Sequence, residues 1–250
     1  MLARRAFCTA FAVTCAGLAT RIVNAAQQLT LATSEWPPYT GSALPDQGLV
    51  SSLIRLALAA KGYTATIEVV PWERAKQGAL GGDYGGYFAA YEAAAGGVAS
   101  RSILQTPLMI AQRKSAPLSF TNAGDLRGKT IGVVEGYSNE PEFDKLAAAG
   151  AISTDPASDD AGSLRKLVAG RIDGAIIDQY VFTYIMHNDD GLKASIDTVE
   201  LNPTPLANKA VHLVVKDTAA GRTLLNDFDQ AIAAIDIKSA IAAYMEKAGL

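Results

Sequence analysis

Short apolar runs and amphipathic stretches alternate along most of this chain. Residues 29–33 form an apolar run typical of a strand. In residues 49–60 the apolar positions recur at the three- and four-residue spacing of a helix, which Gly62 would end, and residues 66–70 indicate a second strand. A strand, a helix and a strand in this length predict a βαβ unit, which closes into a parallel sheet.

The same rhythm restarts after the strand-like residues 103–113, so the chain is predicted to contain two α/β units. Strands are also predicted at 87–90, 129–134, 172–177 and 211–215, and helices at 73–80, 140–149, 160–169, 179–187, 219–235 and 237–248. The last two helices carry apolar residues at helical spacing, which indicates that they pack on a core.

Two proline-containing segments, 114–118 and 201–207, are the expected crossings between the units. If the C-terminal helices return to the first unit, lobe I is discontinuous and comprises residues 27–114 and 206–250, with lobe II at 115–205. The two crossings then lie side by side as a hinge, with a cleft between the lobes. Periodicity alone does not establish that return.

Residues 1–26 differ in chemistry from the rest of the chain. Arg4 and Arg5 precede an apolar run of about 14 residues, shorter than the roughly 20 that span a bilayer. A small-residue end follows, so a cleaved signal peptide and a periplasmic location are predicted, with a permanent membrane anchor as the alternative. Both cysteines, Cys8 and Cys15, lie in this segment, which leaves the mature chain without a thiol or a disulfide; lipid attachment at Cys15 is a further alternative.

Charge narrows the classes of partner. The chain has 22 basic and 25 acidic residues, and removing Arg4, Arg5 and Arg21 with the signal leaves 19 against 25, a net charge of −6. No concentrated basic segment is present, so nucleic acid is not an expected partner. The two histidines, His187 and His212, have no metal-ligand spacing, and neither a metal nor another cofactor is expected.

Four phrases occur in an order that resembles one family. They are residues 32–39 (ATSEWPPY), 70–75 (VPWERA), 125–138 (DLRGKTIGVVEGYS) and 170–178 (GRIDGAIID). Together they resemble the type II periplasmic solute-binding proteins, in particular the amino-acid-binding components of ABC importers. The phrases extend over nearly all of the predicted mature chain, and each falls where the strand pattern places it.

The resemblance implies an α/β fold of two lobes. Each lobe would be a mixed, mostly parallel sheet flanked by helices, with two hinge crossings between the lobes. It also implies a monomeric, non-catalytic protein that closes on a small polar solute and delivers it to an ABC importer permease. The ligand would lie at the carboxyl ends of the parallel strands, as is general for such sheets.

Aromatic residues follow the first predicted strand at this edge. Trp36 and Tyr39 flank the rigid Pro37-Pro38 turn and would stack on a solute at a small entropic cost. The alternative for Trp36 is an ordinary position in the lobe core.

Trp72 and Arg74 come at the start of the next helix, where an arginine fork would grip a carboxylate. Alternatively Glu73 caps the helix and Arg74 is a surface residue. The resemblance also implies that the main chain of Ala90 and the hydroxyl of Tyr91 lie around the ligand.

Two positions in the second unit complete the candidate site. Ser138 lies between a strand and a helix, where it would receive a ligand oxygen or simply cap the helix. Asp178 matches the family's acidic residue that holds a ligand amine. The carboxylate-clamping arginine of amino-acid-binding relatives has no counterpart in residues 92–99, and Arg101 comes too late, which disfavours an unmodified α-amino acid.

Two other functions remain open from the sequence. Some relatives with this scaffold are periplasmic dehydratases of the cyclohexadienyl type, and Glu35, Glu73, Glu135 and Asp178 are candidates for an acid–base pair. A ligand-sensing accessory protein of a signalling system is the other alternative.

Overall fold

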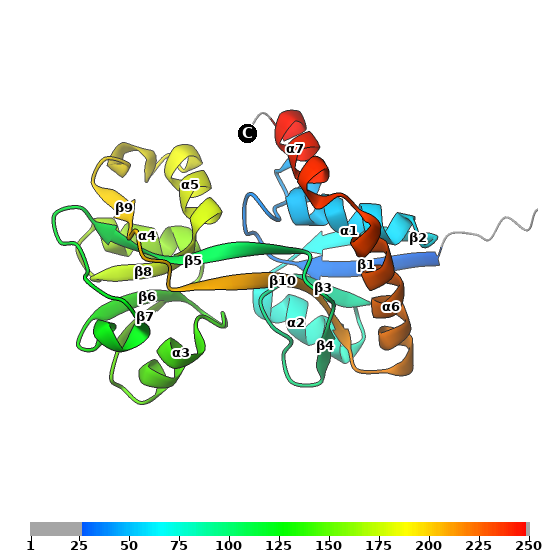
Figure 1. Ribbon diagram of the computed structural model, residues 1–250, viewed down its shortest axis with the longest axis horizontal. Helices are drawn as coiled ribbons and strands as arrows, with labels where there is room; N and C mark the ends of the chain where they lie inside the picture. The colour runs from blue at the N-terminus through cyan, green and yellow to red at the C-terminus, as the bar shows by residue number, and fades with distance from the viewer. Residues whose placement is uncertain (1–26, 249–250) are drawn as a thin grey trace, which may run out of the picture.

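The computed structural model describes residues 27–248, so the predicted signal peptide lies outside the described residues. Two α/β bodies are joined by two long strands, β5 (Leu104–Arg113) and β10 (Ala207–Lys216), which run side by side across the middle of the molecule (Figure 1). This is the two-lobed α/β architecture that the resemblance predicted.

The first body contains the N-terminal strands and the C-terminal helices. Its central strand β1 pairs in parallel with both β2 and β3, and β10 adds antiparallel to β3. Helices α6 and α7 both pack against α1, so the end of the chain returns to this body (Figure 1). Its elements are β1 (Gln27–Thr33), α1 (Leu49–Ala59), β2 (Tyr63–Val69), α2 (Trp72–Gly81), β3 (Gly86–Ala90), β4 (Gly97–Ala99), α6 (Ala219–Ala234) and α7 (Ile237–Ala248).

The second body is built around β6, which pairs in parallel with β7 and β8, while β5 adds antiparallel to β8. Helices α4 and α5 begin at carboxylate caps, because the side chains of Asp159 and Asp178 accept backbone N–H groups of the first turn. Its elements are β6 (Thr130–Val134), α3 (Pro141–Ala148), β7 (Ser153–Ala157), α4 (Asp160–Val168), β8 (Gly174–Asp178), α5 (Gln179–Asn188) and β9 (Val199–Leu201). Three short 3-10 helices, Pro45–Gln47, Ala123–Leu126 and Lys193–Ser195, complete the described chain.

The connection between the bodies is a two-stranded antiparallel ribbon. Residues 104–108 of β5 pair with residues 207–211 of β10, and the strand order β2-β1-β3-β10-β5-β8-β6-β7 is therefore continuous. From Leu108 onward β5 already belongs to the sheet of the second body. The chain thus crosses within β5 and β10, whereas the sequence pointed to the loops 114–118 and 201–207. The lobe division at 114/115 and 205/206 stays a prediction.

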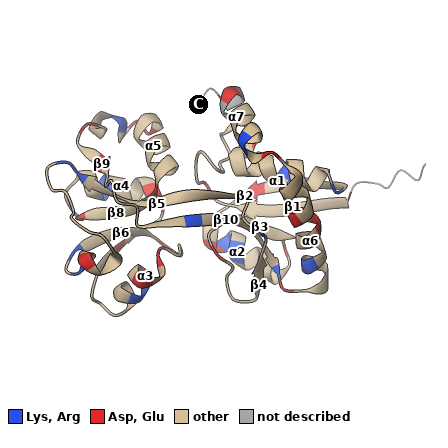
Figure 2. Ribbon diagram, in the orientation of Figure 1, with Lys and Arg blue, Asp and Glu red and all other residues tan. Residues whose placement is uncertain are grey.

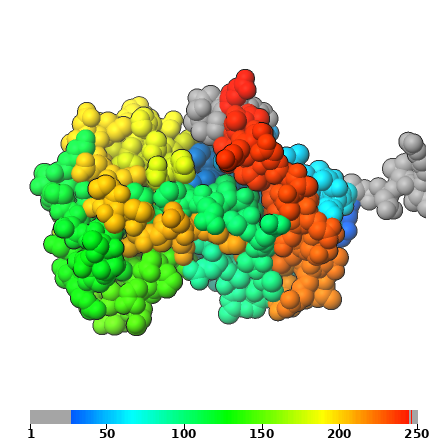
Figure 3. Space-filling model, viewed as in Figure 1, coloured from blue at the N-terminus to red at the C-terminus, as the bar shows by residue number. Residues whose placement is uncertain are grey.

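The apolar core is continuous from one body to the other. One cluster of buried side chains extends from Leu31 and Trp36 in the first body to Val181 and Ile185 in the second. Side chains of the two bodies meet across the middle in the space-filling view (Figure 3). Acidic and basic residues are interspersed over both bodies (Figure 2). None of the helices in residues 27–248 has the length and apolar character needed to cross a bilayer.

Candidate functional site between the two bodies

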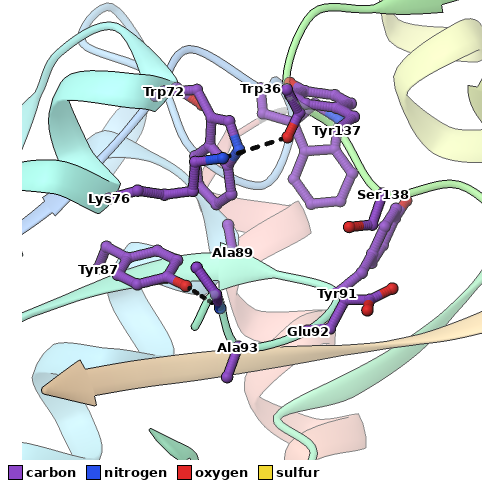
Figure 4. A pocket seen from close by; sticks show the side chains of 13 residues that line it. Trp36, Trp72, Lys76, Tyr87, Ala89, Tyr91, Glu92, Ala93, Tyr137 and Ser138 are labelled. Carbon is purple, nitrogen blue, oxygen red and sulfur yellow. Dashed lines mark hydrogen bonds between the residues drawn. The ribbon is translucent and has the colours of Figure 1, made fainter. Parts of the chain in front are cut away.

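A cavity of about 80 Å³ lies where the two bodies face each other (Figure 4). The first body supplies the loop after β1, the start of α2 and the end of β3, and the second supplies the loop after β6. The lining residues are Ser34, Trp36, Trp72, Lys76, Tyr87, Ala89, Tyr91, Glu92, Ala93, Ala94, Gly136, Tyr137 and Ser138. The ends of β1, β3 and β6 thus meet at one site, as expected for the carboxyl ends of parallel strands.

Five of the 13 lining residues are aromatic. Trp36 meets Tyr91 edge to face with ring centroids 5.5 Å apart. Trp72 meets Tyr87 at 5.5 Å and Tyr137 at 6.1 Å, both nearly perpendicular. Edge-to-face contacts of this kind stabilise the rings against one another, so the cavity has a continuous aromatic side.

Contacts across the cavity hold the two bodies together. Tyr137 belongs to the second body and touches Trp72 of the first, and Lys76 Nζ donates to the carbonyl oxygen of Gly136 at 3.4 Å. Lys209 on β10 donates to the carbonyl oxygen of Asn139 at 2.5 Å. The bodies are therefore in contact around the cavity, as in a closed form.

Ala89 contributes an unusual backbone to the cavity wall. Its φ angle is +65°, a conformation that non-glycine residues seldom adopt, and the pairing of β3 with β10 shifts register beside it. Such outliers persist only where the surroundings impose them, and they cluster at ligand sites.

The cavity has one basic and one acidic side chain in its lining, and each already has a partner. Lys76 Nζ lies 2.6 Å from a carboxylate oxygen of Glu73 and 5.9 Å from the centre of the Trp72 ring. Glu92 lies 3.4 Å from Lys209 Nζ. Among the lining residues, the cavity thus offers no basic group that is still without an acidic partner.

Asp178 lies deeper, behind the aromatic wall, at the start of α5. Its Oδ1 atom accepts the N–H groups of Tyr180 and Val181 at 2.8 and 3.2 Å and the hydroxyl of Tyr39 at 3.1 Å. Its Oδ2 atom accepts the hydroxyls of Thr106 and, at 3.5 Å, Tyr91. Burial raises the pKa of Asp178, and these hydrogen bonds oppose that rise.

Tyr39 supports Asp178 from behind. It is 2% exposed, does not line the cavity, and its hydroxyl also lies 2.7 Å from the Thr106 hydroxyl. Burial raises the pKa of Tyr39, and the nearby charge of Asp178 adds to the rise. Because Thr106 lies on β5 and Asp178 on β8, Tyr39 ties the loop after β1 to the second body.

The structure brings together most of the predicted site residues. Trp36, Trp72, Tyr91 and Ser138 line the cavity. Trp36 is also 4% exposed and part of the core, so both interpretations of this residue apply. Asp178 lies just behind the wall.

Arg74 and Ala90 do not line this cavity, and their assignment to the ligand site stays a prediction. Arg74 is exposed and lines a separate depression beside Gln77 and Asp83, because it is two residues from Trp72 and so on another face of α2. Ala90 is 1% exposed and packs in the core of the first body, since neighbouring strand residues point to opposite faces.

Several lining residues were not predicted from the sequence. Lys76 is one helical turn after Trp72, and that spacing was the available signal. Tyr87 and Tyr137 had no signal beyond being aromatic near strand ends. Within residues 27–248 there is no group of three or more His, Cys, Asp or Glu side chains placed to hold a metal ion.

Comparison with known proteins identifies the fold. No family model matches the chain, and no curated protein matches it by sequence. Solved structures do match. The ligand-binding core of GluR0 from Nostoc punctiforme in complex with L-glutamate is 17% identical with a TM-score of 0.70, over 88% of this chain and 98% of that one.

Two further structures match equally well. A histidine kinase sensor domain with similarity to periplasmic binding proteins is 16% identical with a TM-score of 0.70, over 90% of this chain and 96% of that one. An amino acid ABC transporter substrate-binding protein from Streptococcus pneumoniae, bound to L-arginine, is 13% identical with a TM-score of 0.69, over 88% and 94%. The chain therefore has the type II periplasmic-binding-protein fold.

Proposed function

We propose that this chain is an extracytoplasmic solute-binding protein that captures a small polar molecule between its two lobes and delivers it to an ABC importer. The observation that carries the proposal is a cavity whose walls come from both lobes, with Trp36 and Trp72 on one side and Tyr137 and Ser138 on the other. A ligand held there contacts both lobes at once, so it favours the closed form over an open one.

The ribbon of β5 and β10 suits such a closure. Only residues 104–108 and 207–211 pair across the middle, so a change of twist in this ribbon rotates the lobes without breaking either sheet. The signal peptide in residues 1–26, the periplasmic location, the monomeric state and the permease partner are parts of the same proposal. The ligand is amino-acid-like or bears an amine or a carboxylate, because Ser138 is a partner for a ligand oxygen and Asp178 is a partner for a ligand amine.

A ligand panel tests the capture of a solute. Thermal shift followed by titration calorimetry would be run with amino acids, small amines and small carboxylates. We expect one class to bind, and Trp72→Ala to weaken its binding by at least tenfold. Arg74→Ala is the matched control, because Arg74 is on the same helix but outside the cavity, and it should change affinity less than twofold. If no member of the panel bound to the folded protein, capture of a small solute would be refuted.

A sensor is the second candidate, because the sensor domain of a histidine kinase has the same fold over 90% of this chain. Deleting the gene for this protein distinguishes an importer component from a sensor. Loss of uptake of the bound solute indicates an importer component, whereas unchanged uptake with a lost transcriptional response indicates a sensor.

An enzyme is less well supported by the geometry. Glu35, Glu73 and Glu135 are all exposed, whereas Asp178 is buried and occupied by hydrogen bonds, so none of the three is an evident acid–base partner for it. Incubation of the purified protein with its bound solute, followed by NMR, should return the solute unchanged. Conversion of the solute would favour the enzyme.

A further inference from the structure

A second, much smaller chamber of about 10 Å³ lies beyond the aromatic wall of the cavity. Trp36, Tyr91 and Tyr137 line both spaces, so the chamber and the cavity adjoin each other at these rings. A space of about 10–15 Å³ by this measure holds one water molecule. An ammonium group has the same size, whereas a carboxylate or a quaternary ammonium is larger.

Two carboxylates, Asp160 and Asp178, line this chamber, and its described lining contains no Lys, Arg or His. Asp178 is 2% exposed, but donors from Tyr39, Tyr91 and Thr106 and two backbone N–H groups surround it. Its charge is therefore compensated in the absence of a ligand.

Asp160 is buried to nearly the same degree, at 7% exposed, but it has no such compensation. Its carboxylate interacts with its own backbone N–H, and the charged groups nearest to it are two more carboxylates, Asp159 and Asp178. A buried carboxylate with its own backbone N–H as a donor and no cation beside it is costly to keep ionised. A proton or a positive group from outside the protein lowers that cost.

We propose that Asp160 determines specificity in this cleft by receiving the primary ammonium group of the ligand, and that the ligand class is a primary amine that needs no carboxylate. The inference rests on the proposed function and narrows its ligand. The ammonium occupies the small chamber, where Asp160 and Asp178 supply negative charge. The aromatic rings of Trp36, Tyr91 and Tyr137 border the same chamber, and a ring whose face meets the ammonium adds cation–π attraction.

The larger cavity then holds the body of the amine. Five aromatic residues line it, and its volume of about 80 Å³ is several times that of the small chamber. Lys76 is the only Lys or Arg in the lining and already pairs with Glu73. A ligand carboxylate would compete with Glu73 for Lys76, which disfavours amino acids relative to the amines of the same skeleton.

The surroundings of Asp160 also favour a cation. Asp160 lines, on its other side, a surface groove of about 320 Å³ together with Glu35, Asp159 and Asp189. The described lining of this groove contains no basic residue. Asp189 is paired with Arg165 at 2.6 Å, which leaves Glu35, Asp159 and Asp160 as the main source of negative charge. Clefts lined by one sign of charge concentrate ligands of the opposite sign, so this groove favours cations near Asp160.

Two matched sets of compounds test the ligand class by titration calorimetry. One set is butylamine, norvaline and pentanoate, and the other is 2-phenylethylamine, phenylalanine and 3-phenylpropionate. In each set the second compound adds a carboxylate to the amine, and the third lacks the amine. We expect the amine to bind at least tenfold more tightly than the amino acid in the set that fits, and the carboxylate not to bind.

Asp160→Asn tests the residue, and Asp159→Asn is its control. Asparagine in place of Asp159 would keep the helix cap, so the control removes an adjacent exposed charge without removing the buried one. We expect Asp160→Asn to weaken amine binding by roughly 10- to 100-fold, the loss typical of a charge-assisted contact, and Asp159→Asn by less than threefold.

Equal effects of the two variants would overturn the role of Asp160. Tighter binding of norvaline or phenylalanine than of the matching amine would overturn the ligand class but leave solute capture standing. Binding of the carboxylates alone would do the same. Failure of all six compounds, when another solute from the wider panel binds, would also refute only this inference.

Discussion

Replacing Asp160 with asparagine should stabilise the ligand-free protein at neutral pH. Burial first, and then the charges of Asp178 and Asp159, raise the pKa of Asp160 from 3.8 to about 7. Between pH 3.8 and about pH 7, Asp160 therefore keeps its proton in the folded protein but has released it in the unfolded chain. Stability from this group is therefore complete below about pH 4, falls as the pH rises, and is lost above about pH 7.

The size of the effect follows from the shift. One pKa unit corresponds to 1.36 kcal/mol, so the full shift is on the order of 4 kcal/mol, of which about 2 kcal/mol falls between pH 5 and pH 7. Asparagine does not titrate, so Asp160→Asn avoids this loss. The unfolding free energy of the variant minus that of the original protein should rise by about 2 kcal/mol from pH 5 to pH 7 and then level off above pH 7.

Urea unfolding at pH 5, 6, 7 and 8, in buffers without amines, measures this difference. Other groups facing Asp160, namely Glu35, Tyr91, Tyr137 and Asp178, are present in both proteins, so most of their own titration cancels in the difference. Asp159→Asn should show no comparable trend because Asp159 is exposed. A difference for Asp160→Asn that stays constant across this pH range would refute the account of Asp160 as an uncompensated buried carboxylate.

Three further outcomes are expected. Amine affinity, measured by calorimetry, should rise up to tenfold per unit between pH 5 and pH 7 as Asp160 loses its proton, and should be flat in Asp160→Asn. Tyr39→Phe removes a hydroxyl that serves Asp178 and Thr106 and should lower the unfolding free energy in urea by about 1–3 kcal/mol, whereas Tyr84→Phe, which loses an exposed contact, should lower it by less than about 0.5 kcal/mol. Ala89→Val should destabilise by about 2 kcal/mol and Ala89→Gly should not, because φ is +65° there; equal effects of the two would show that backbone conformation does not govern this position.

Most of the helices and strands were predictable because their apolar residues face a core. The strands that were missed, β4, β7 and β9, are short, and β7 (Ser153–Ala157) contains a proline and is mostly accessible at the end of its sheet. Such a strand needs no apolar alternation, because only one neighbour and little core contact it.

The crossing between the lobes shows where periodicity stops being informative. Apolar residues in β5 predicted a strand, but its burial is similar whether it pairs within one lobe or passes between two. The first residues of β10, which form the ribbon with β5, are partly exposed and so did not look like a strand. Tertiary packing sets the pairing partners of a strand, and the prolines in residues 114–118 and 201–207 carry no information about that pairing.

In the candidate site, a residue lines the cavity only if its position on the helix or strand turns its side chain towards the cavity. Trp72 and Lys76 are four residues apart and share one face of α2, whereas Arg74 between them does not. Ala89 lines the cavity and Ala90 does not, because strand residues alternate and Ala89 has a positive φ. The phrases that resemble a family identify the region of the chain, and the phase of the helix or strand then selects the residue.

Asp160 and Asp178 look alike in the sequence, since each is an aspartate at the start of a predicted helix. Asp178 drew attention because it ends an apolar strand, whereas Asp160 follows Asp159 in a pair that is typical of a simple helix cap. In the structure Asp159 is the cap and Asp160 is buried. What separates the two buried carboxylates is the number of donors around each, and the donors to Asp178 come from β5, from the loop after β1 and from the loop after β3. Asp178 thus has five donors, whereas Asp160 has its own backbone N–H, and this asymmetry is the physical reason to expect the ligand to bring its positive charge to Asp160.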